Sequence, residues 1–359
     1  MPAPQGSEIL QFHCPVAVHG SRVAWAAGKN LVIYDFGVKK IERDLSETKH
    51  TDTIRAIAFS KDGEMVATAG EDKRVVVQGT SGEVKEFLHG KKIMAVHVDD
   101  SGVVLFGDKF GDFYRMRQGS EAEAPPEHMK EMNDEDDEDN DEETSKAIEL
   151  MFGHISAISM SLYSSKRKLL VSADRDEKIR IARYPRADII ESFLLKHRRY
   201  VSHLVWGNDD HTILVSGGAD GQIIEWDISD CGHPKIVRVH HVGEDETGFH
   251  TVACDSGKIY FVTVDDAKNL CVIDGDEVRK WTMPFEIQSV KSVEGRLIAI
   301  DSNSHMHVVN STTGEVEETV KLSKDVPGLP ISYLKLVHHE NLNGEERDSK
   351  RKKKGGPFS

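Results

Sequence analysis

The chain has 359 residues, of which 38% are hydrophobic and 7% aromatic, and its formal net charge is −15 at pH 7. This composition supports a packed core and excludes a wholly disordered chain. No apolar run approaches the roughly 20 residues that cross a bilayer, and the N-terminus lacks the regions of a secretory signal. We therefore expect no membrane segment and no export signal.

Short strands rich in valine, isoleucine and phenylalanine recur along the chain, separated by turns of glycine, aspartate and serine. This pattern predicts an all-β fold. The strands gather into seven units, at residues 9–36, 49–78, 91–117, 153–182, 196–226, 236–274 and 287–320. Without the segment 118–147, the mean unit is about 41 residues, within the ~40–45 typical of one propeller blade.

Three of these units, at 49–78, 153–182 and 196–226, share an ordered set of polar residues. Each has a histidine, then a serine or threonine, then an aspartate, and these are His50, Thr68 and Asp72; His154, Ser172 and Asp176; and His197, Ser216 and Asp220. The sixth residue after the aspartate is Gln78, Ala182 or Trp226. Such polar residues inside a blade are stable only as a completely hydrogen-bonded network.

This repeat resembles that of WD-repeat proteins, and the third unit ends in the signature pair Trp226–Asp227. The resemblance implies a seven-bladed β-propeller. It also implies that His197, Ser216, Asp220 and Trp226 form a structural network inside one blade. The first two units lack the tryptophan, so the complete network is expected only in the third.

We expect the propeller to span residues 1–322. The segment 118–147 contains "NDEDDEDNDEE" and is expected to be a disordered acidic insertion between blades three and four. Residues 121–143 carry 13 acidic residues against one lysine, so the rest of the chain is nearly balanced. Residues 323–341 are expected to form a closing element, and 342–359 a basic, flexible tail.

No catalytic motif is found in the sequence. It has no glycine-rich phosphate loop between a strand and a helix, and no GxSxG elbow. Histidine, serine and aspartate recur at blade spacing, which favours a structural network over a hydrolytic triad. The four cysteines and 18 histidines lack metal-ligand spacing. We predict a scaffold with no catalytic residue, no metal and no cofactor of its own.

The hairpin around "ADRDEKIR" (173–180) has more charge than a turn needs. Asp176 is the expected turn aspartate, and Ile179 and Ile181 are the expected core residues. Alternate residues of a strand share a face, so Lys178 and Arg180 are expected to project together. The cations then form either a solvated charged face or a patch for an acidic partner.

The same hairpin is similar to that of the WD-repeat, non-catalytic subunit of the tRNA (guanine-N7-)-methyltransferase. "SRVAWAAGKNLVIYD" (21–35), "VVLFGDKFGDFYRM" (103–116) and the acidic segment add to this resemblance, which covers about residues 15–230. It implies a heterodimer with a catalytic subunit that binds S-adenosylmethionine and methylates a guanosine in the tRNA variable loop. The implied contact residues are Arg175, Asp176, Glu177, Lys178 and Arg180.

Two basic clusters are expected to contact RNA phosphate, one in a blade loop and one in the tail. They are Lys166, Arg167 and Lys168, and Lys350, Arg351, Lys352, Lys353 and Lys354. The tail cluster is also typical of a nuclear-localisation signal, so the nucleus is the expected compartment, with the cytoplasm as a second site. Two alternatives stay open: a general WD scaffold, such as a ubiquitin-ligase substrate receptor or chromatin adaptor, and a hydrolytic propeller.

Overall fold

The computed structural model describes residues 14–46, 48–79, 82–116, 147–244, 247–293 and 295–322. Within these residues, 28 strands form seven antiparallel sheets of four strands each. Blade one contains β1 (Val16–His19), β2 (Arg22–Ala27), β3 (Asn30–Asp35) and β4 (Lys40–Ser46). Blade two contains β5 (Ile54–Phe59), β6 (Met65–Gly70), β7 (Arg74–Gly79) and β8 (Val84–Leu88). Blade three contains β9 (Ile93–Val98), β10 (Val104–Asp108), β11 (Asp112–Met116) and β12 (Ile148–Gly153).

The later blades follow the same order. Blade four contains β13 (Ile158–Ser164), β14 (Leu169–Asp174), β15 (Ile179–Arg183) and β16 (Ile190–Leu194). Blade five contains β17 (Val201–Trp206), β18 (Ile213–Gly218), β19 (Gln222–Asp227) and β20 (Lys235–His241). Blade six contains β21 (Phe249–Asp255), β22 (Lys258–Thr263), the 3-10 turn η2 (Val264–Asp266), β23 (Asn269–Asp274) and β24 (Glu277–Thr282). Blade seven contains β25 (Ile287–Val293), β26 (Arg296–Asp301), β27 (Met306–Asn310) and β28 (Val316–Val320).

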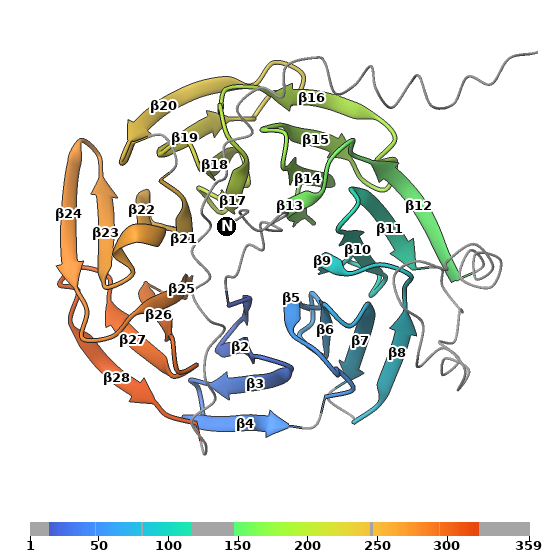
Figure 1. Ribbon diagram of the computed structural model, residues 1–359, viewed down its shortest axis with the longest axis horizontal. Helices are drawn as coiled ribbons and strands as arrows, with labels where there is room; N and C mark the ends of the chain where they lie inside the picture. The colour runs from blue at the N-terminus through green and yellow to red at the C-terminus, as the bar shows by residue number, and fades with distance from the viewer. Residues whose placement is uncertain are drawn as a thin grey trace, which may run out of the picture. The chain divides into compact units, whose positions relative to one another are not determined.

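The seven sheets follow one another around a ring, with the first strand of each blade innermost and the fourth outermost (Figure 1). The predicted seven-bladed β-propeller is therefore confirmed. Because the strands of a blade alternate in direction, the turn between the second and third strands lies at the same end as the connection to the next blade. We call this end of the blades the upper end, and the opposite end the lower end.

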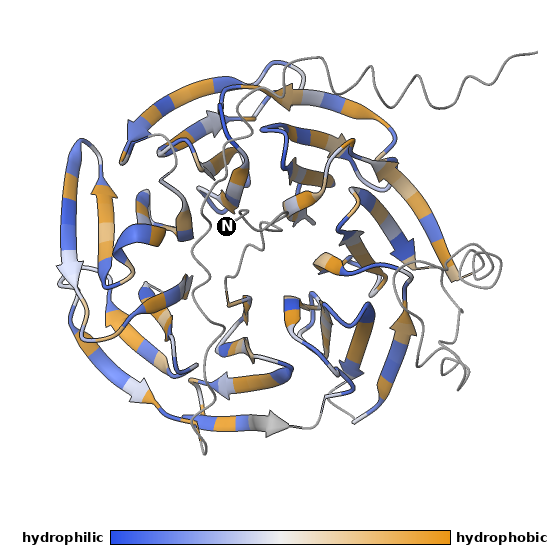
Figure 2. Cartoon of the chain, viewed as in Figure 1, coloured by the Kyte–Doolittle hydropathy of each residue, from blue (hydrophilic) through white to orange (hydrophobic). Residues whose placement is uncertain are grey.

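Burial follows the position of a strand in its blade. Every residue of β14 is buried, and so are the first four of β15, because these strands pack against a neighbouring blade on both faces. Outer strands mix buried and exposed residues, as in β16, and Figure 2 shows polar and apolar residues interspersed along them. The core thus lies between blades, where side chains from consecutive sheets meet.

The acidic segment lies within blade three. The expectation that it separates blades three and four is wrong, because β12, on its far side, pairs with β11 through Phe113 and Phe152. The segment therefore joins the third and fourth strands of one blade, at its lower end. Its own residues up to 146, the closing element expected at 323–341 and the tail at 342–359 lie outside the described residues.

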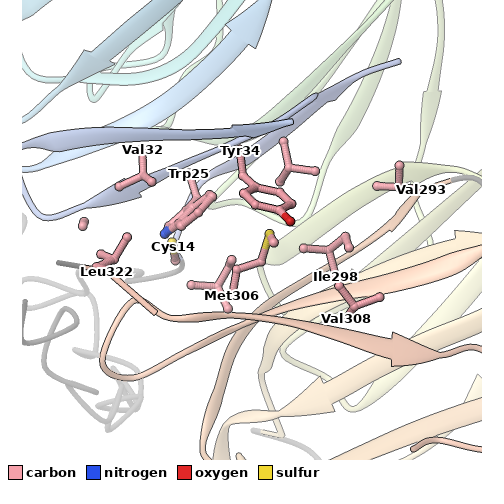
Figure 3. Close-up of a cluster of buried hydrophobic side chains, with 12 residues drawn as sticks. Cys14, Trp25, Val32, Tyr34, Val293, Ile298, Met306, Val308 and Leu322 are labelled. Carbon is pink, nitrogen blue, oxygen red and sulfur yellow. The ribbon is translucent and has the colours of Figure 1, made fainter. Parts of the chain in front are cut away.

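The ring closes by packing between blades one and seven. A buried cluster joins Trp25 and Tyr34 of blade one to Ile298 and Met306 of blade seven (Figure 3). The indole Nε1 of Trp25 donates a hydrogen bond to the carbonyl of Ser304, at 2.9 Å. All four strands of blade seven come from one continuous stretch of chain, 287–320. Among the described residues, no helix is long and apolar enough to cross a membrane.

Candidate protein-binding surface

Blade five contains a complete polar network under its upper turn. His197 lies 3.0 Å from Asp220 through Nδ1 and 2.8 Å from the Ser216 hydroxyl through Nε2. The Trp226 indole donates to the same hydroxyl at 2.9 Å. An imidazole protonated on Nδ1 satisfies every member, since it donates to Asp220 and accepts from Ser216. The four residues singled out in the sequence are therefore joined in one buried chain of hydrogen bonds.

Hydrogen bonds also set the ionisation of the turn aspartate. Burial alone would raise the pKa of Asp220, but the bond from His197 and the backbone N–H groups of Arg198 and Gln222 outweigh it. The pKa therefore lies below its usual range. Blade two repeats this arrangement, with His50 at 3.0 Å from Asp72 and 2.8 Å from Thr68.

Blade four departs from the repeat in the identity of its aspartate. His154 bonds Ser172 at 2.7 Å, but its second partner is Asp174, at 3.0 Å. The prediction that Asp176 is the turn aspartate is wrong, because Asp176 is exposed. A second oxygen of Asp174 accepts from the backbone N–H groups of Asp176 (2.9 Å) and Lys178 (3.1 Å).

Blade four uses Asp174 because its residue two positions before the expected aspartate differs from that of blades two and five. Blades two and five have Gly70 and Gly218 there, and a Cβ on Gly218 would lie 2.3 Å from Nδ1 of His197. A side chain at this position must therefore meet the histidine. Asp174 does so with a hydrogen-bonding group, as Asp108 does toward His89 (3.3 Å) in blade three.

Asp176 is consequently free of the structural role that the sequence assigned to it. It lies with Arg175 and Glu177 on the exposed tip of the upper turn, and Lys178 is half-buried beside them. Glu177 has a left-handed backbone, with φ of +67°, at the position where blade five has Gly221 with φ of +68°. A non-glycine residue in this region is strained, so the turn keeps a glutamate at a cost in stability.

Arg180 does not belong to this exposed set. The expectation that it projects outward with Lys178 is wrong, because only 6% of its surface is exposed. Its guanidinium stacks on the Phe152 ring at 4.2 Å and donates to the carbonyl of Ala187 at 2.6 Å. Lys178 precedes β15, and the face of β15 that holds Arg180 packs against blade three. Burial also lowers the pKa of Arg180.

Exposed apolar side chains surround the turn, and sequence reasoning missed them. Phe110 is 54% exposed, Ile155 is 93% exposed and Leu195 is 68% exposed. All three lie at the upper end, in the connection between blades three and four (Ile155), the connection between blades four and five (Leu195), or the upper turn of blade three (Phe110). Their positions in connecting segments were the available signal, because an isoleucine or phenylalanine in a turn has no core to fill.

Backbone hydrogen bonds show that these segments are adjacent. The N–H of His154 donates to the carbonyl of Gly111 at 2.9 Å, next to Phe110. The N–H of Arg175 donates to the carbonyl of Ala157 at 3.0 Å. Leu194 pairs with Ile179, so Leu195 lies beside Lys178. We define the upper blade-four surface as Phe110, Ile155, Arg175, Asp176, Glu177, Lys178 and Leu195.

The chemistry of this surface is that of a protein interface. Phe110, Ile155 and Leu195 lie around the charged turn, and the ammonium groups of Lys91 and Lys109 lie 4.7 and 5.1 Å from the centre of the Phe110 ring. Large exposed apolar groups next to charged ones mark interaction sites. At the turn, Arg175 and Lys178 are balanced by Asp176 and Glu177, but Lys91 and Lys109 beside Phe110 add two cations, which suits a partner with carboxylates.

The basic cluster at 166–168 has structural partners. Arg167 bridges blades four and five by donating to the carbonyls of His211 (3.1 Å), Ile228 (2.6 Å) and Ser229 (2.8 Å). Lys166 donates to the Asp209 carbonyl. Lys168 pairs with Asp100 of blade three, and this bond, with that from Ser165, lowers the pKa of Asp100 to about 2.

Arg167 is therefore engaged by three carbonyls of blade five, whereas Lys166 and Lys168 are exposed beside their partners. That Lys166, Arg167 and Lys168 contact RNA phosphate stays a prediction. The cluster Lys350, Arg351, Lys352, Lys353 and Lys354 lies outside the described residues. Within the described part of the chain, no group of three or more His, Cys, Asp or Glu residues is placed to hold a metal ion.

Comparisons with known proteins show which propellers this chain is similar to. Residues 118–269 match the family described as "tRNA methyltransferase TRM82 WD40 domain", and residues 43–77 match "WD domain, G-beta repeat". Two solved structures share the fold. One, described as "Crystal Structure of Mitotic Checkpoint Complex", has a TM-score of 0.62 and 14% identity, and covers 85% of this chain and 96% of that one. The other, the Cps50 (Swd1) β-propeller domain of Myceliophteria thermophila, has a TM-score of 0.65 and 11% identity, and covers 81% and 94%.

Curated relatives have a common description. The tRNA (guanine-N(7)-)-methyltransferase non-catalytic subunit wdr4 of Dictyostelium discoideum is 34% identical over 230 residues, or 61% of this chain and 48% of the relative. The subunit TRM82 of Meyerozyma guilliermondii is 33% identical, over 48% and 39%. The subunit wuho of Drosophila melanogaster is 28% identical, over 46% and 35%. This chain thus spans half or less of the length of these relatives. The predicted resemblance is confirmed: the chain is a WD-repeat β-propeller similar to the non-catalytic subunits of tRNA (guanine-N7-)-methyltransferases.

Proposed function

We propose that this chain is the non-catalytic subunit of a tRNA (guanine-N7-)-methyltransferase and holds the catalytic subunit in a heterodimer. The observation that carries the proposal is the match of residues 118–269, because this stretch contains the whole of blade four and its exposed turn. The relatives are named non-catalytic subunits, so methyl transfer is assigned to the partner, which would bind S-adenosylmethionine.

The upper blade-four surface is the proposed contact. Arg175 and Lys178 offer cations to carboxylates of the partner, and arginine suits this role because its planar fork binds a carboxylate through two hydrogen bonds. Ile155 and Phe110 offer apolar area beside them. Truncating an anchor residue of such an interface costs about 2–4 kcal/mol of binding free energy, because a few residues carry most of the affinity.

The propeller's role toward tRNA is proposed to be indirect. Its described body has its loop cations paired internally at 166–168, so tRNA binding is assigned mainly to the complex. The tail cluster at 350–354 is proposed to make salt-dependent phosphate contacts and to direct the protein to the nucleus.

Reconstitution with a candidate methyltransferase tests the proposal. The purified chain, the candidate partner and the pair are each incubated with tRNA and S-adenosylmethionine, and N7-methylguanosine is measured by mass spectrometry of the digested tRNA. We expect methylation by the pair, little by the partner alone and none by this chain. Equal activity of the partner with and without the chain would refute the proposal.

Matched variants test the surface. Arg175→Glu with Lys178→Glu, and separately Ile155→Ser, are expected to abolish co-purification without changing the thermal unfolding temperature. The control for charge is Arg186→Glu, at the lower end of the same blade, and that for the apolar change is Val237→Ser on outer strand β20, where Val237 is 54% exposed. Retained binding by both surface variants would place the contact elsewhere.

A further inference from the structure

A cavity of about 290 Å³ lies at the centre of the ring. The first strands of all seven blades line it, and β25, the first strand of blade seven, contributes Ser289 and Lys291. These strands are the innermost ones in Figure 1. The cavity is therefore distinct from the upper blade-four surface, which lies on turns and connections at the ends of the blades. The inference drawn from it goes beyond the proposed function.

The lining of this cavity has basic groups but no acidic ones. Four of the described lining residues, Arg55, His97, His203 and Lys291, have basic side chains. None of the described lining residues is an aspartate or a glutamate. A concave site lined by charge of one sign attracts ions of the other sign, so this cavity is suited to an anionic group.

Three of the four basic side chains are already engaged. Arg55 donates from Nε to Glu71 at 2.6 Å. His97 lies 2.7 Å from the Ser161 hydroxyl, and burial lowers the pKa of its imidazole to about 4, so the ring is neutral at pH 7. His203 lies 3.1 Å from the hydroxyl of the preceding serine. The fourth side chain, Lys291, is left as the source of positive charge.

The ammonium group of Lys291 has no counter-charge. The side chain is half-buried, and within the described part of the chain no carboxylate or hydrogen-bond acceptor is paired with it. Burial lowers the pKa of Lys291 for this reason. Holding a cation in this way is costly, so an anion that enters the cavity and pairs with Lys291 stabilises the site.

The blade itself does not require a lysine at this position. Lys291 pairs with Ile298 in the sheet of blade seven. The residues at the same register in blades two to six are apolar, apart from one neutral histidine. They are Ala58, His97, Leu162, Val205 and Ala253. The cation is therefore no part of the repeat, which favours a role in binding.

Ser289 supplies a second donor beside the lysine. It lies two residues earlier on β25, and alternate residues of a strand share a face with Cα atoms roughly 6.6 Å apart. Ser289 is 4% exposed, and its hydroxyl also has no partner among the described residues. One ammonium and one hydroxyl match the single charge and two oxygens of a carboxylate. A phosphate monoester has nearly two charges and three acceptor oxygens, which these two donors do not satisfy.

We propose that the central cavity binds a carboxylate group, held by the Lys291 ammonium and the Ser289 hydroxyl. The carbon atoms next to the carboxylate pack on apolar side chains of the lining, such as Ala56, Val96 and Met160. The volume of about 290 Å³ is close to the lower limit of ligand sites, ~300 Å³. The group therefore belongs to a small organic acid or to one aspartate or glutamate side chain of a bound segment.

Titration of the full chain at fixed ionic strength tests this proposal. Butyrate represents a free acid, and butyramide is its uncharged counterpart. A blocked pentapeptide with one glutamate between glycine and serine residues represents a bound segment, and the same peptide with glutamine is its counterpart. Binding is followed by calorimetry and by saturation-transfer NMR. We expect at least one acid to bind at least tenfold more tightly than its amide, and the tighter acid identifies the source of the carboxylate.

Variants locate the site. Lys291→Met removes the charge but keeps an unbranched apolar side chain, so we expect it to retain the fold and to weaken binding of the acid at least tenfold. Ser289→Ala is expected to weaken binding at least threefold. Lys235→Met is the control, since Lys235 is exposed on the outer strand β20, and it should not alter binding.

Three outcomes would each overturn the proposal. They are equal binding of acid and amide in both pairs, unchanged binding by Lys291→Met, and tighter binding of inorganic phosphate than of either acid. The thermal unfolding temperature of each variant shows whether it has folded. If Lys291→Met does not fold, unchanged binding by Ser289→Ala overturns the proposal in its place.

Discussion

The two aspartates of the blade-four turn should differ sharply in their contribution to stability. The repeat spacing points to Asp176 as the partner of His154, but the structure gives that place to Asp174. We expect Asp174→Ala to destabilise the fold strongly and Asp176→Ala to leave it nearly unchanged. The two substitutions are chemically identical and two residues apart, so the comparison isolates the position of the carboxylate.

The magnitude follows from the hydrogen bonds that each variant removes. Asp174 is 1% exposed and accepts from His154 at 3.0 Å and from two backbone N–H groups at 2.9 and 3.1 Å. Hydrogen bonds to a charged group contribute about 1.5–3 kcal/mol each, and water replaces part of this at the turn. We expect a loss of about 3–5 kcal/mol for Asp174→Ala, and less than about 0.5 kcal/mol for the exposed Asp176.

Urea unfolding followed by circular dichroism provides the assay. If Asp174→Ala does not fold, Asp174→Asn keeps the shape of the side chain and should show a smaller loss of the same sign. A larger loss for Asp176→Ala than for Asp174→Ala would refute the reasoning, because the histidine would then use the aspartate that the repeat predicts.

Three further predictions concern single side chains. Arg180→Met should destabilise the fold by about 1–3 kcal/mol, because it leaves the buried carbonyl of Ala187 without its donor, and it should leave co-purification with the partner intact; loss of the partner with an unchanged melting temperature would show an outward contact instead. Glu177→Gly should stabilise the fold by about 0.5–1 kcal/mol in urea unfolding, since glycine relieves the left-handed strain but is more flexible when unfolded; a loss of stability would contradict the strain. Burial lowers the pKa of His97 to about 4. Its contribution to the free energy of unfolding is therefore complete above pH 6.5 and falls as the pH drops toward 4, by about 3 kcal/mol at most. His97→Gln should flatten that part of the curve of stability against pH, and an unaltered slope would exclude His97 as its source.

The sequence pattern was sufficient to predict those features that depend on the residues of a single blade. Strands, turns and the seven-fold repeat follow from apolar runs and turn residues. The blade-five network follows too, because His197, Ser216, Asp220 and Trp226 belong to one continuous stretch of chain. The sequence also shows that the turn at 175–177 has more charged residues than a hairpin requires.

Contacts between blades could not be predicted in this way. Lys168 meets Asp100 across 68 residues, and Arg167 meets carbonyls of blade five, so both cations looked free in the sequence. The alternation of residues predicts an outward Arg180, but only the packing of blade three shows that its face of the strand is covered. The return of the chain at β12 to pair with β11 was hidden by the long acidic segment between them.

The sequence by itself determined the seven-bladed architecture and the family resemblance, because strand period and turn chemistry are local properties repeated along the chain. The tertiary structure alone decided which charges are exposed and which are covered. The burial of Arg180 and the pairing of Lys168 depend on side chains of adjacent blades, which are distant in sequence and meet only when the ring is formed.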